Sequence, residues 1–300
     1  MKVGSQERLW RPARAVMCLL LLAPLVSVVS PASGRSPKKP SVATLVGQLK
    51  TCKSLDTCAV VEAIVSRKGG FWPQLAVGLD APDEMTRFWT LGVLSKAPVK
   101  KAIEAIAGKL GDPKIRVRAA AAYALGALRS KDVTPHLLRA VLDKDLNVRF
   151  AAVVAMGRVR DPATVDALLN ACRDRDEDVR AYAVAALGDI GDKRSLPRLH
   201  ERLEQDVHGK VRGFAGMALA RFKDPTSVPV LKRRLKEEKD AKALAASIYA
   251  LGEIGDATSA DLIKSHAAHE NDEVREYVAR ALEKLGTGTP ADTSKKKGEK

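Results

Sequence analysis

Arginine recurs at a fixed interval through the middle of this chain. Arg87, Arg118, Arg149 and Arg180 follow one another every 31 residues, and Arg212 comes 32 residues later. A period of about 20–50 residues is typical of an array in which one supersecondary unit is stacked repeatedly. The interval therefore predicts that most of the 300 residues form a repeat array. We call each of these side chains the reference arginine of its unit.

The positions that follow each reference arginine have the pattern of a helix. After Arg180, for example, small or branched residues stand three and four positions later, at Ala183 and Val184, and an apolar residue stands seven positions later, at Leu187. Offsets of 3, 4 and 7 share one face of a helix. Small side chains on that face allow neighbouring helices to approach closely. Each reference arginine is therefore expected near the start of a helix.

A second apolar stripe precedes each of these helices. Leu196, Leu199 and Leu203 form one such stripe, and Ser195 and Ser227 are expected to cap two of the helix starts. No stretch alternates between apolar and polar residues, so no strands are predicted. The predicted fold is all-α, a right-handed α-solenoid of stacked helix pairs with a period of about 31 residues. In each pair, the reference arginine belongs to the second helix.

One string of residues connects this chain with a known family. From Asp176 to Gly188 the sequence has the form Asp-x-x-Val-Arg-x-x-Ala-x-x-Ala-Leu-Gly, and related strings recur in other units. The chain resembles HEAT-like repeats over residues 72–286, in particular the short type found in phycobilisome lyases. The resemblance implies stacked helix pairs and says almost nothing about activity.

An aspartate stands six residues before four of the reference arginines. The pairs are Asp112 and Arg118, Asp143 and Arg149, Asp174 and Arg180, and Asp206 and Arg212. We interpret them as a structural ladder of hydrogen bonds between neighbouring turns, because residues that recur in every unit serve stacking. The alternative is a row of anion-binding sites. Ala81 replaces the aspartate before Arg87, and Glu238 and Leu244 stand where a later unit should have Asp and Arg. The ladder is therefore expected only in the four central units.

The two ends of the chain differ from the repeats. Residues 1–34 have the order of a secretory signal, with basic residues, then 15 mostly apolar positions from Ala15 to Val29, then small residues suited to cleavage. A membrane-spanning helix needs about 20 apolar residues, so cleavage is favoured. The sequence predicts a periplasmic or secreted protein with no transmembrane span in the mature chain; the alternative is anchoring through an uncleaved N-terminal segment. Residues 35–40 are expected to be a basic linker, and residues 287–300 a disordered basic tail.

Residues 41–71 are expected to form a degenerate helical cap, because the terminal units of repeat arrays are atypical. This segment contains Cys52 and Cys58 on either side of a plausible turn. Disulfides persist in the oxidising compartments to which a signal leads, so we predict a Cys52–Cys58 bridge, with two free thiols as the alternative. Cys172 lies on the apolar stripe of a first helix and is expected to be a buried free thiol.

No catalytic constellation emerges from the sequence. His266 and His269 could share a helical face, but neither a third ligand nor a partnered acid accompanies them. The chain has no phosphate-binding Gly-rich loop, nucleophile elbow or zinc-type cysteine spacing. The sequence therefore predicts a protein that is not an enzyme and that holds no metal and no cofactor.

Aromatic residues indicate a candidate binding surface. Several of them stand two positions after the reference position, about 200° around the helix, whereas the apolar stripe lies near 340°. They therefore point away from the core of the pair, toward the concave groove of a solenoid, where aromatic and arginine side chains dominate binding energetics. The candidates are Trp89, Tyr182, Phe214 and Tyr277 at offset two, Tyr123 and Tyr249 at offset five, and Arg158 and Arg221 at offset nine, which point to the same side. The alternative is that the rings pack against the next second helix.

The net charge of +15 raises a second possibility. Lys232, Arg233, Arg234 and Lys236 form a basic patch on a first helix. It is either a solvated outer face or a contact for an acidic protein or an anionic surface.

We therefore expect an exported, non-catalytic scaffold that binds another protein through its concave face. A first alternative is a lyase or chaperone-like factor, which the resemblance to phycobilisome lyases implies. A second is a basic module that binds polyanions or an anionic surface. Export argues against nucleic acid as the natural partner.

Overall fold

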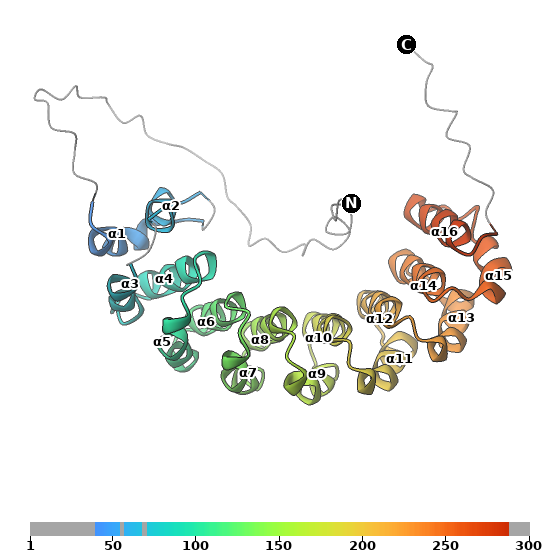
Figure 1. Ribbon diagram of the computed structural model, residues 1–300, viewed down its shortest axis with the longest axis horizontal. Helices are drawn as coiled ribbons and strands as arrows, with labels where there is room; N and C mark the ends of the chain where they lie inside the picture. The colour runs from blue at the N-terminus through green and yellow to red at the C-terminus, as the bar shows by residue number, and fades with distance from the viewer. Residues whose placement is uncertain (1–39, 55–56, 68–70, 288–300) are drawn as a thin grey trace, which may run out of the picture. The chain divides into compact units, whose positions relative to one another are not determined.

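The computed structural model describes residues 40–54, 57–67 and 71–287, all within one compact unit. Every regular element of these residues is a helix, and they contain no strand. Figure 1 shows the helices in two rows, one inside the other. The predicted all-α fold of stacked helix pairs is confirmed. The predicted signal, nearly all of the linker and the tail beyond residue 287 lie outside the described residues.

The second helices of the pairs form the inner row (Figure 1), and each contacts the next one along the chain. They are α4 (Glu84–Lys96), α6 (Ile115–Ala127), α8 (Leu146–Val159), α10 (Glu177–Ile190), α12 (Gly209–Phe222), α14 (Ala241–Ile254) and α16 (Asp272–Lys284). Each reference arginine lies in the first turn or two of its helix, as the sequence predicted.

The first helices form the outer row. They are α3 (Trp72–Leu79), α5 (Ile103–Gly108), α7 (Thr134–Ala140), α9 (Val165–Ala171), α11 (Leu196–Gln205), α13 (Val228–Glu237) and α15 (Ala260–Lys264). Short 3-10 turns lead into most of them: η2 (Lys100–Ala102), η4 (Lys131–Val133), η5 (Pro162–Thr164), η6 (Lys193–Ser195), η7 (Pro225–Ser227) and η8 (Ala257–Ser259). A further turn, η3 (Lys109–Gly111), follows α5.

The core lies between the two rows, where the predicted stripes meet. Val184 and Leu187 of α10 are fully buried, and so are Leu199 and Leu203 of α11. Full burial of one such side chain contributes about 1.5–3 kcal/mol. The repeat of these positions in every unit explains why one core continues through the array.

The Leu-Gly step of the repeated string sets the spacing within the inner row. A Cβ at Gly126 would lie 2.6 Å from the Cβ of Ala155 on α8, and one at Gly188 would lie 2.7 Å from that of Ala218 on α12. Such distances are shorter than carbon atoms tolerate. Glycine at this position therefore allows the inner helices to pack closely against one another.

The predicted serine caps are wrong. Ser195 and Ser227 precede α11 and α13, but their side chains make no capping hydrogen bond and are buried. A 3-10 turn stands before each helix, and the aspartate ahead of that turn accepts the free amide, as Asp192 does from the Arg194 N–H at 2.9 Å. The acidic residue between units therefore has the capping role that the sequence assigned to serine.

Two helices precede the array, α1 (Val42–Gln48), which runs into η1 (Leu49–Thr51), and α2 (Ala59–Val65). They lie where the helical cap was expected. A disulfide joins Cys52 after η1 to Cys58 at the start of α2, with 5.5 Å between the Cα atoms. The predicted bridge is therefore present, and Cys172 is a buried free thiol, as predicted. Across residues 40–287, apart from the short gaps at 55–56 and 68–70, no helix has the length and apolar character needed to span a bilayer.

Candidate protein-interaction surface

Three aromatic rings from consecutive inner helices contact one another. The ring centroids of Phe150 on α8 and Tyr182 on α10 are 4.7 Å apart, and those of Tyr182 and Phe214 on α12 are 5.5 Å apart. All three side chains are half-buried. We call Phe150, Tyr182 and Phe214 the ring row. Its members both stabilise the stack, as the alternative interpretation held, and keep part of each side chain accessible.

Two of the predicted groove residues do not belong to an accessible surface. Trp89 is only 7% exposed, because α1, α2 and η1 pack against α4 at that end of the array. Tyr277 is 6% exposed, with its ring 5.7 Å from that of Tyr249. Helical position alone does not show whether neighbouring helices cover a ring, and both rings are covered here.

The other predicted aromatics are intermediate in exposure. Tyr123 and Tyr249 are half-buried, and burial raises the pKa of Tyr123 to about 12. Phe150 was not among the predicted groove residues, because it stands one position after its reference arginine, whereas the predicted rings stand two or five positions after theirs. The sequence feature that indicates it is a second ring, Tyr182, 32 positions later in the neighbouring unit.

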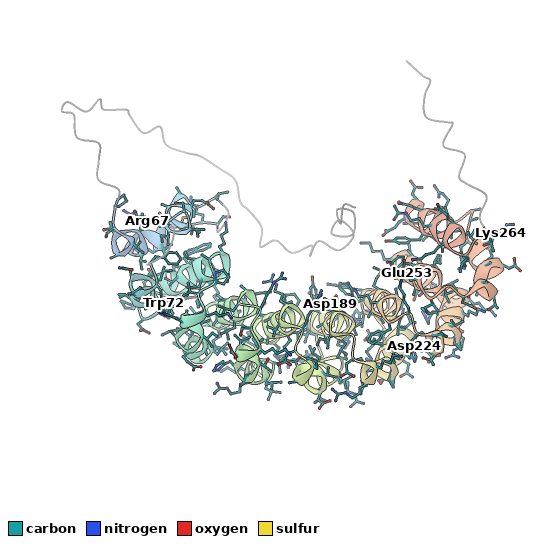
Figure 2. All side chains as sticks on the ribbon, viewed as in Figure 1. Arg67, Trp72, Asp189, Asp224, Glu253 and Lys264 are labelled. Carbon is teal, nitrogen blue, oxygen red and sulfur yellow. A yellow bond between two sulfur atoms is a disulfide. The ribbon has the colours of Figure 1, made fainter. Side chains whose placement is uncertain are left out.

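Charged residues line the C-terminal ends of the inner helices, about two turns along each helix from the ring row. We call this set the C-terminal edge; it comprises Arg129, Arg158, Arg160, Asp189, Arg221, Lys223, Glu253 and Lys284. Figure 2 shows Asp189 and Glu253 on the inner side of α10 and α14. Asp189 forms ion pairs with Arg221 at 3.4 Å and with Arg160 at 3.9 Å. Of the two predicted arginines, Arg221 is therefore paired, whereas Arg158 is exposed and has no ion pair among the described residues.

The opposite ends of the same helices carry the ladder. The Arg149 guanidinium donates from Nε to Asp174 Oδ2 at 2.7 Å and from Nη2 to Oδ1 at 2.9 Å. Its Nη1 donates to the Asp143 carbonyl oxygen at 3.1 Å. Each arginine thus binds the carboxylate of the following unit and only the backbone of the aspartate six residues before it. The grouping by six residues in the sequence analysis did not identify the bonded partner.

The ladder is also longer than the four units expected. Its pairs are Arg87 with Asp112, Arg118 with Asp143, Arg149 with Asp174, Arg180 with Asp206, and Arg212 with Glu238. Arg87 needs no aspartate before it, since its Nη1 donates to the Ala81 carbonyl oxygen at 2.8 Å. Glu238 replaces aspartate and receives Arg212 Nε at 2.7 Å. Each guanidinium is occupied by partners within the chain, which favours the structural interpretation over a row of anion sites.

Sequence comparison agrees with this architecture. A family model described as HEAT repeats matches residues 73–156, 142–213 and 197–283. The chain belongs to the HEAT-repeat family. A search of curated proteins finds no match.

Solved structures share the HEAT-repeat fold at low sequence identity. The Escherichia coli protein YibA is 23% identical, with a TM-score of 0.58 over 84% of this chain and 99% of that one. An engineered protein is 19% identical, with a TM-score of 0.53 over 83% of this chain and 79% of that one. The complex of CpcE and CpcF of phycocyanin lyase from Nostoc is 21% identical, with a TM-score of 0.48 over 73% and 88%. At these identities the likeness to YibA and to the engineered protein concerns the fold alone.

The basic patch on α13 of this HEAT-repeat array is largely neutralised. Lys232 pairs with Asp256 at 3.1 Å and Arg233 with Glu204 at 2.7 Å. Arg234 donates to Glu238 at 2.8 Å, so it belongs to the end of the ladder. Only Lys236 is exposed without an ion pair among the described residues. The solvated-face interpretation of the patch is therefore favoured.

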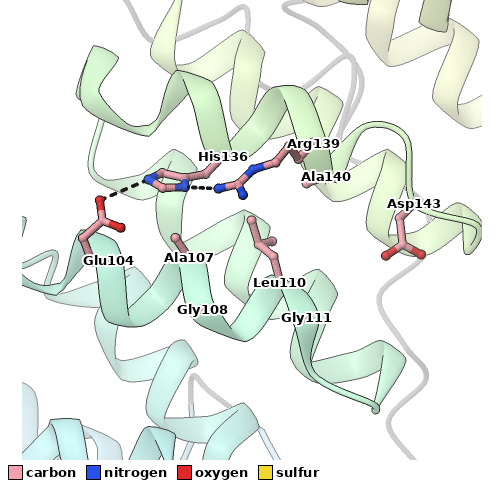
Figure 3. Close-up of a pocket in the computed structure, with 9 residues that line it drawn as sticks. All are labelled: Glu104, Ala107, Gly108, Leu110, Gly111, His136, Arg139, Ala140 and Asp143. Carbon is pink, nitrogen blue, oxygen red and sulfur yellow. Dashed lines mark hydrogen bonds and ion pairs between the residues drawn. The ribbon is translucent and has the colours of Figure 1, made fainter.

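A cavity of about 460 Å³ lies in the outer row between α5 and α7 (Figure 3). The space beside Gly108 is open, because a Cβ there would meet nothing within 4 Å. His136 lies 3.3 Å from Glu104 and 2.8 Å from the Arg139 guanidinium. Both His136 ring nitrogens are thus occupied, and no Ser, Thr or Cys side chain is among the residues that line the cavity. In the part of the HEAT-repeat chain that the structure describes, no cluster of His, Cys, Asp and Glu could hold a metal ion.

Proposed function

We propose that this protein is an exported, non-catalytic scaffold that binds another protein through the inner side of its HEAT-repeat array. The observation that carries this proposal is the ring row. Phe150, Tyr182 and Phe214 form a continuous aromatic strip across three helices, and each ring keeps part of its surface accessible. Large rigid rings bind with little loss of conformational freedom, and they dominate the energetics of protein interfaces.

The charged surfaces support a protein partner over a polyanion. A polyanion site needs several cations free to neutralise phosphates or similar groups. Three of the four patch residues on α13 are already ion-paired, and the ladder arginines are occupied. The ring row offers partly accessible aromatic surface, which suits apolar and aromatic side chains of a protein partner.

Export is supported by two independent features. Residues 1–34 have the order of a cleavable signal, and the Cys52–Cys58 bridge is of the kind that persists in an oxidising compartment. The mature N-terminus should begin near residue 33 or 35. N-terminal sequencing of the protein from its own cells tests this, and intact Met1 on soluble cytoplasmic protein would contradict it. Intact Met1 in the membrane fraction would indicate anchoring instead.

The binding proposal is tested by capture from the envelope fraction with matched variants. Wild-type chain and a Tyr182→Ala, Phe214→Ala double variant serve as baits, with Arg173→Ala as a control because Arg173 is exposed on the outer side, just after α9. We expect one partner that wild type and control retain in high salt and that the double variant loses. Equal retention by a folded double variant would exclude the ring row as the binding surface. Release of the partner by salt alone would favour the polyanion alternative.

A further inference from the structure

The C-terminal edge repeats a charge pattern in which one acid lies between two cations. Asp189 lies between Arg160 of the preceding unit and Arg221 of the following unit, at 3.9 and 3.4 Å. Two units later, Glu253 lies between Lys223 and Lys284, at 3.2 and 2.5 Å. Both acids stand nine positions after the reference position of their unit. The same arrangement at two places along the array shows that this position accommodates a carboxylate between cations from both neighbours.

The unit of α8 has a cation where the units of α10 and α14 have these acids. Arg158 stands nine positions after Arg149. The same position is also a cation at Arg221 and Lys284, but there the preceding inner helix ends in Gly191 or Gly255 and presents no cation. Arg129 at the end of α6 is equivalent to Arg160 and Lys223, the cations that precede the two acids. Both Arg129 and Arg158 are exposed, and neither has an ion pair among the described residues. This part of the edge therefore has two guanidinium groups and lacks the carboxylate that the pattern supplies elsewhere.

The backbone indicates that the arginine at the end of α6 is not there for stability. Arg129 has a φ of 48°, in the left-handed region. Gly191 and Gly255 occupy the equivalent position after α10 and α14, with φ of 76° and 82°. Glycine is the preferred residue at this point of a helix end, and a side chain there is disfavoured. Arg160 and Lys223 also stand at this position in the left-handed region, with φ of 55° and 50°, and the side chain of each pairs with an acid. Retention of Arg129 in the same conformation points to a use for its side chain too.

Aromatic groups lie beside the two arginines. Burial raises the pKa of Tyr123, and the charge of Arg158 opposes that rise, so the two side chains are neighbours. Phe150, the first member of the ring row, precedes Arg158 by eight residues in the same helix, about 12 Å along its axis. An extended peptide segment of a few residues would reach from the two arginines to these partly exposed rings.

We propose that Arg129 and Arg158 bind a carboxylate of the partner, from an Asp or Glu that adjoins apolar or aromatic residues of a peptide segment. The inference rests on the proposed scaffold function and specifies what the scaffold recognises. Guanidinium groups bind carboxylates through paired, charge-assisted hydrogen bonds. The neighbouring apolar residues of the segment contact Tyr123 and the ring row. The partner's acid thus completes the pattern that Asp189 and Glu253 complete within the chain.

Peptide display provides the probe. A library of random 12-residue peptides is selected against the exported chain, and the strongest binder is synthesised with its acidic residue intact and with that residue changed to Asn or Gln. We expect the selected peptides to combine an acid with nearby aromatic or aliphatic residues. The amide version should bind about tenfold more weakly, since it loses a charge-assisted contact.

Variants then assign the effect to the two arginines. Arg158→Gln and Arg129→Gln should each weaken the acidic peptide about tenfold and leave the amide peptide nearly unchanged. Arg173→Gln on the outer side is the matched control and should bind both peptides as wild type does. Thermal unfolding followed by circular dichroism verifies that each variant is folded.

The outcomes separate this inference from the proposed function. The carboxylate site is overturned if the selected peptides lack an acid, or if the arginine variants weaken both peptides equally. The scaffold proposal stands in either case, provided that Tyr182→Ala abolishes peptide binding. If no peptide binds wild type more tightly than Tyr182→Ala, the ring row is not a binding surface and both proposals are overturned.

Discussion

The two ends of the inner helices carry two rows of charge that differ in how completely they are paired. In the ladder, each arginine from Arg87 to Arg212 binds a carboxylate of the next unit. Along the C-terminal edge, pairing is complete at Asp189 and Glu253 and fails at Arg158. A charged residue that recurs together with its ion-pair partner in successive units stabilises the packing of those units. A charged residue such as Arg158, which has no such partner in the chain, is a candidate for binding a group on another molecule.

Burial differs between the rows as well. The side chains of Arg149 and Asp174 in the ladder are 10% and 12% exposed, whereas that of Arg160 on the edge is 64% exposed. Exposed ion pairs contribute at most about 1 kcal/mol, because water and salt screen them. Removing one partner of a buried pair costs far more, because it leaves an uncompensated charge. An arginine in the ladder should therefore contribute much more to the free energy of unfolding than an arginine on the C-terminal edge.

The largest expected effect tests this difference within α8. Arg149→Ala should destabilise the chain by about 3–5 kcal/mol, because Asp174 is left buried without its guanidinium and two carbonyl oxygens lose their donor. Arg158→Ala, nine residues later, should change stability by less than about 0.5 kcal/mol. Urea unfolding measures both. Similar losses for the two variants would mean that the two rows are energetically equivalent.

A second test uses the pH dependence of the last ladder pair. Burial alone would raise the pKa of Glu238, but hydrogen bonds from Arg212 and Arg234 outweigh it and hold the pKa at about 2, below its ordinary value of 4.5. A lowered folded-state pKa contributes stability above the unfolded-state value and loses it as pH falls through the folded-state value. The contribution should therefore disappear between about pH 4.5 and about pH 2.

Glu238→Gln isolates that contribution, because its side chain does not titrate. The free energy of unfolding of wild type should exceed that of the variant near neutral pH, and the difference should shrink as the pH falls below about 4.5. Urea unfolding over this pH range measures it. A difference that is independent of pH would show that the charge of Glu238 does not stabilise the ladder.

The sequence predicted the repeat and the core well, because both depend on spacing within one unit. The stripe of Val184 and Leu187 follows from helical geometry alone, and those residues are buried as expected. The bonded partner in the ladder could not be found in the same way. Asp112 and Asp143 are equivalent in a repeating sequence, so spacing alone cannot tell whether Arg118 binds its own unit or the next. The observed bond joins it to Asp143.

The surface was less predictable than the stack. Trp89 has the helical position of a groove residue, yet the atypical cap covers it. Arg158 was identified for its helical position, but its missing partner became visible only once Asp189 and Glu253 were seen in their ion pairs. An alignment of position nine could not have singled out Arg158, because Arg221 and Lys284 are cations at the same position.

A third test asks whether the Tyr182 ring contributes to stability as much as a core side chain does. Tyr182→Ala should destabilise by about 1 kcal/mol, since it loses two ring contacts from a half-buried site. Leu187→Ala, on the buried face of the same helix, should cost about 2–5 kcal/mol because it leaves a cavity. Thermal unfolding compares the two. An equal loss would assign Tyr182 to the stack and remove the basis for the ring row as a binding surface.

The smallest expected effect tests whether Arg129 is retained for binding. A left-handed conformation costs a residue with a side chain roughly 1–2 kcal/mol. Glycine avoids that cost, but it loses more conformational freedom on folding, so the net gain in stability is smaller. Arg129→Gly should therefore stabilise the chain by about 0.5 kcal/mol and weaken the acidic peptide. Arg160→Gly is the matched control, with a φ of 55° and an exposed pair to Asp189. It should give a similar gain and leave peptide binding largely intact. A loss of stability in Arg129→Gly would mean that contacts within the chain hold this side chain, and the edge would then be as fully paired as the ladder.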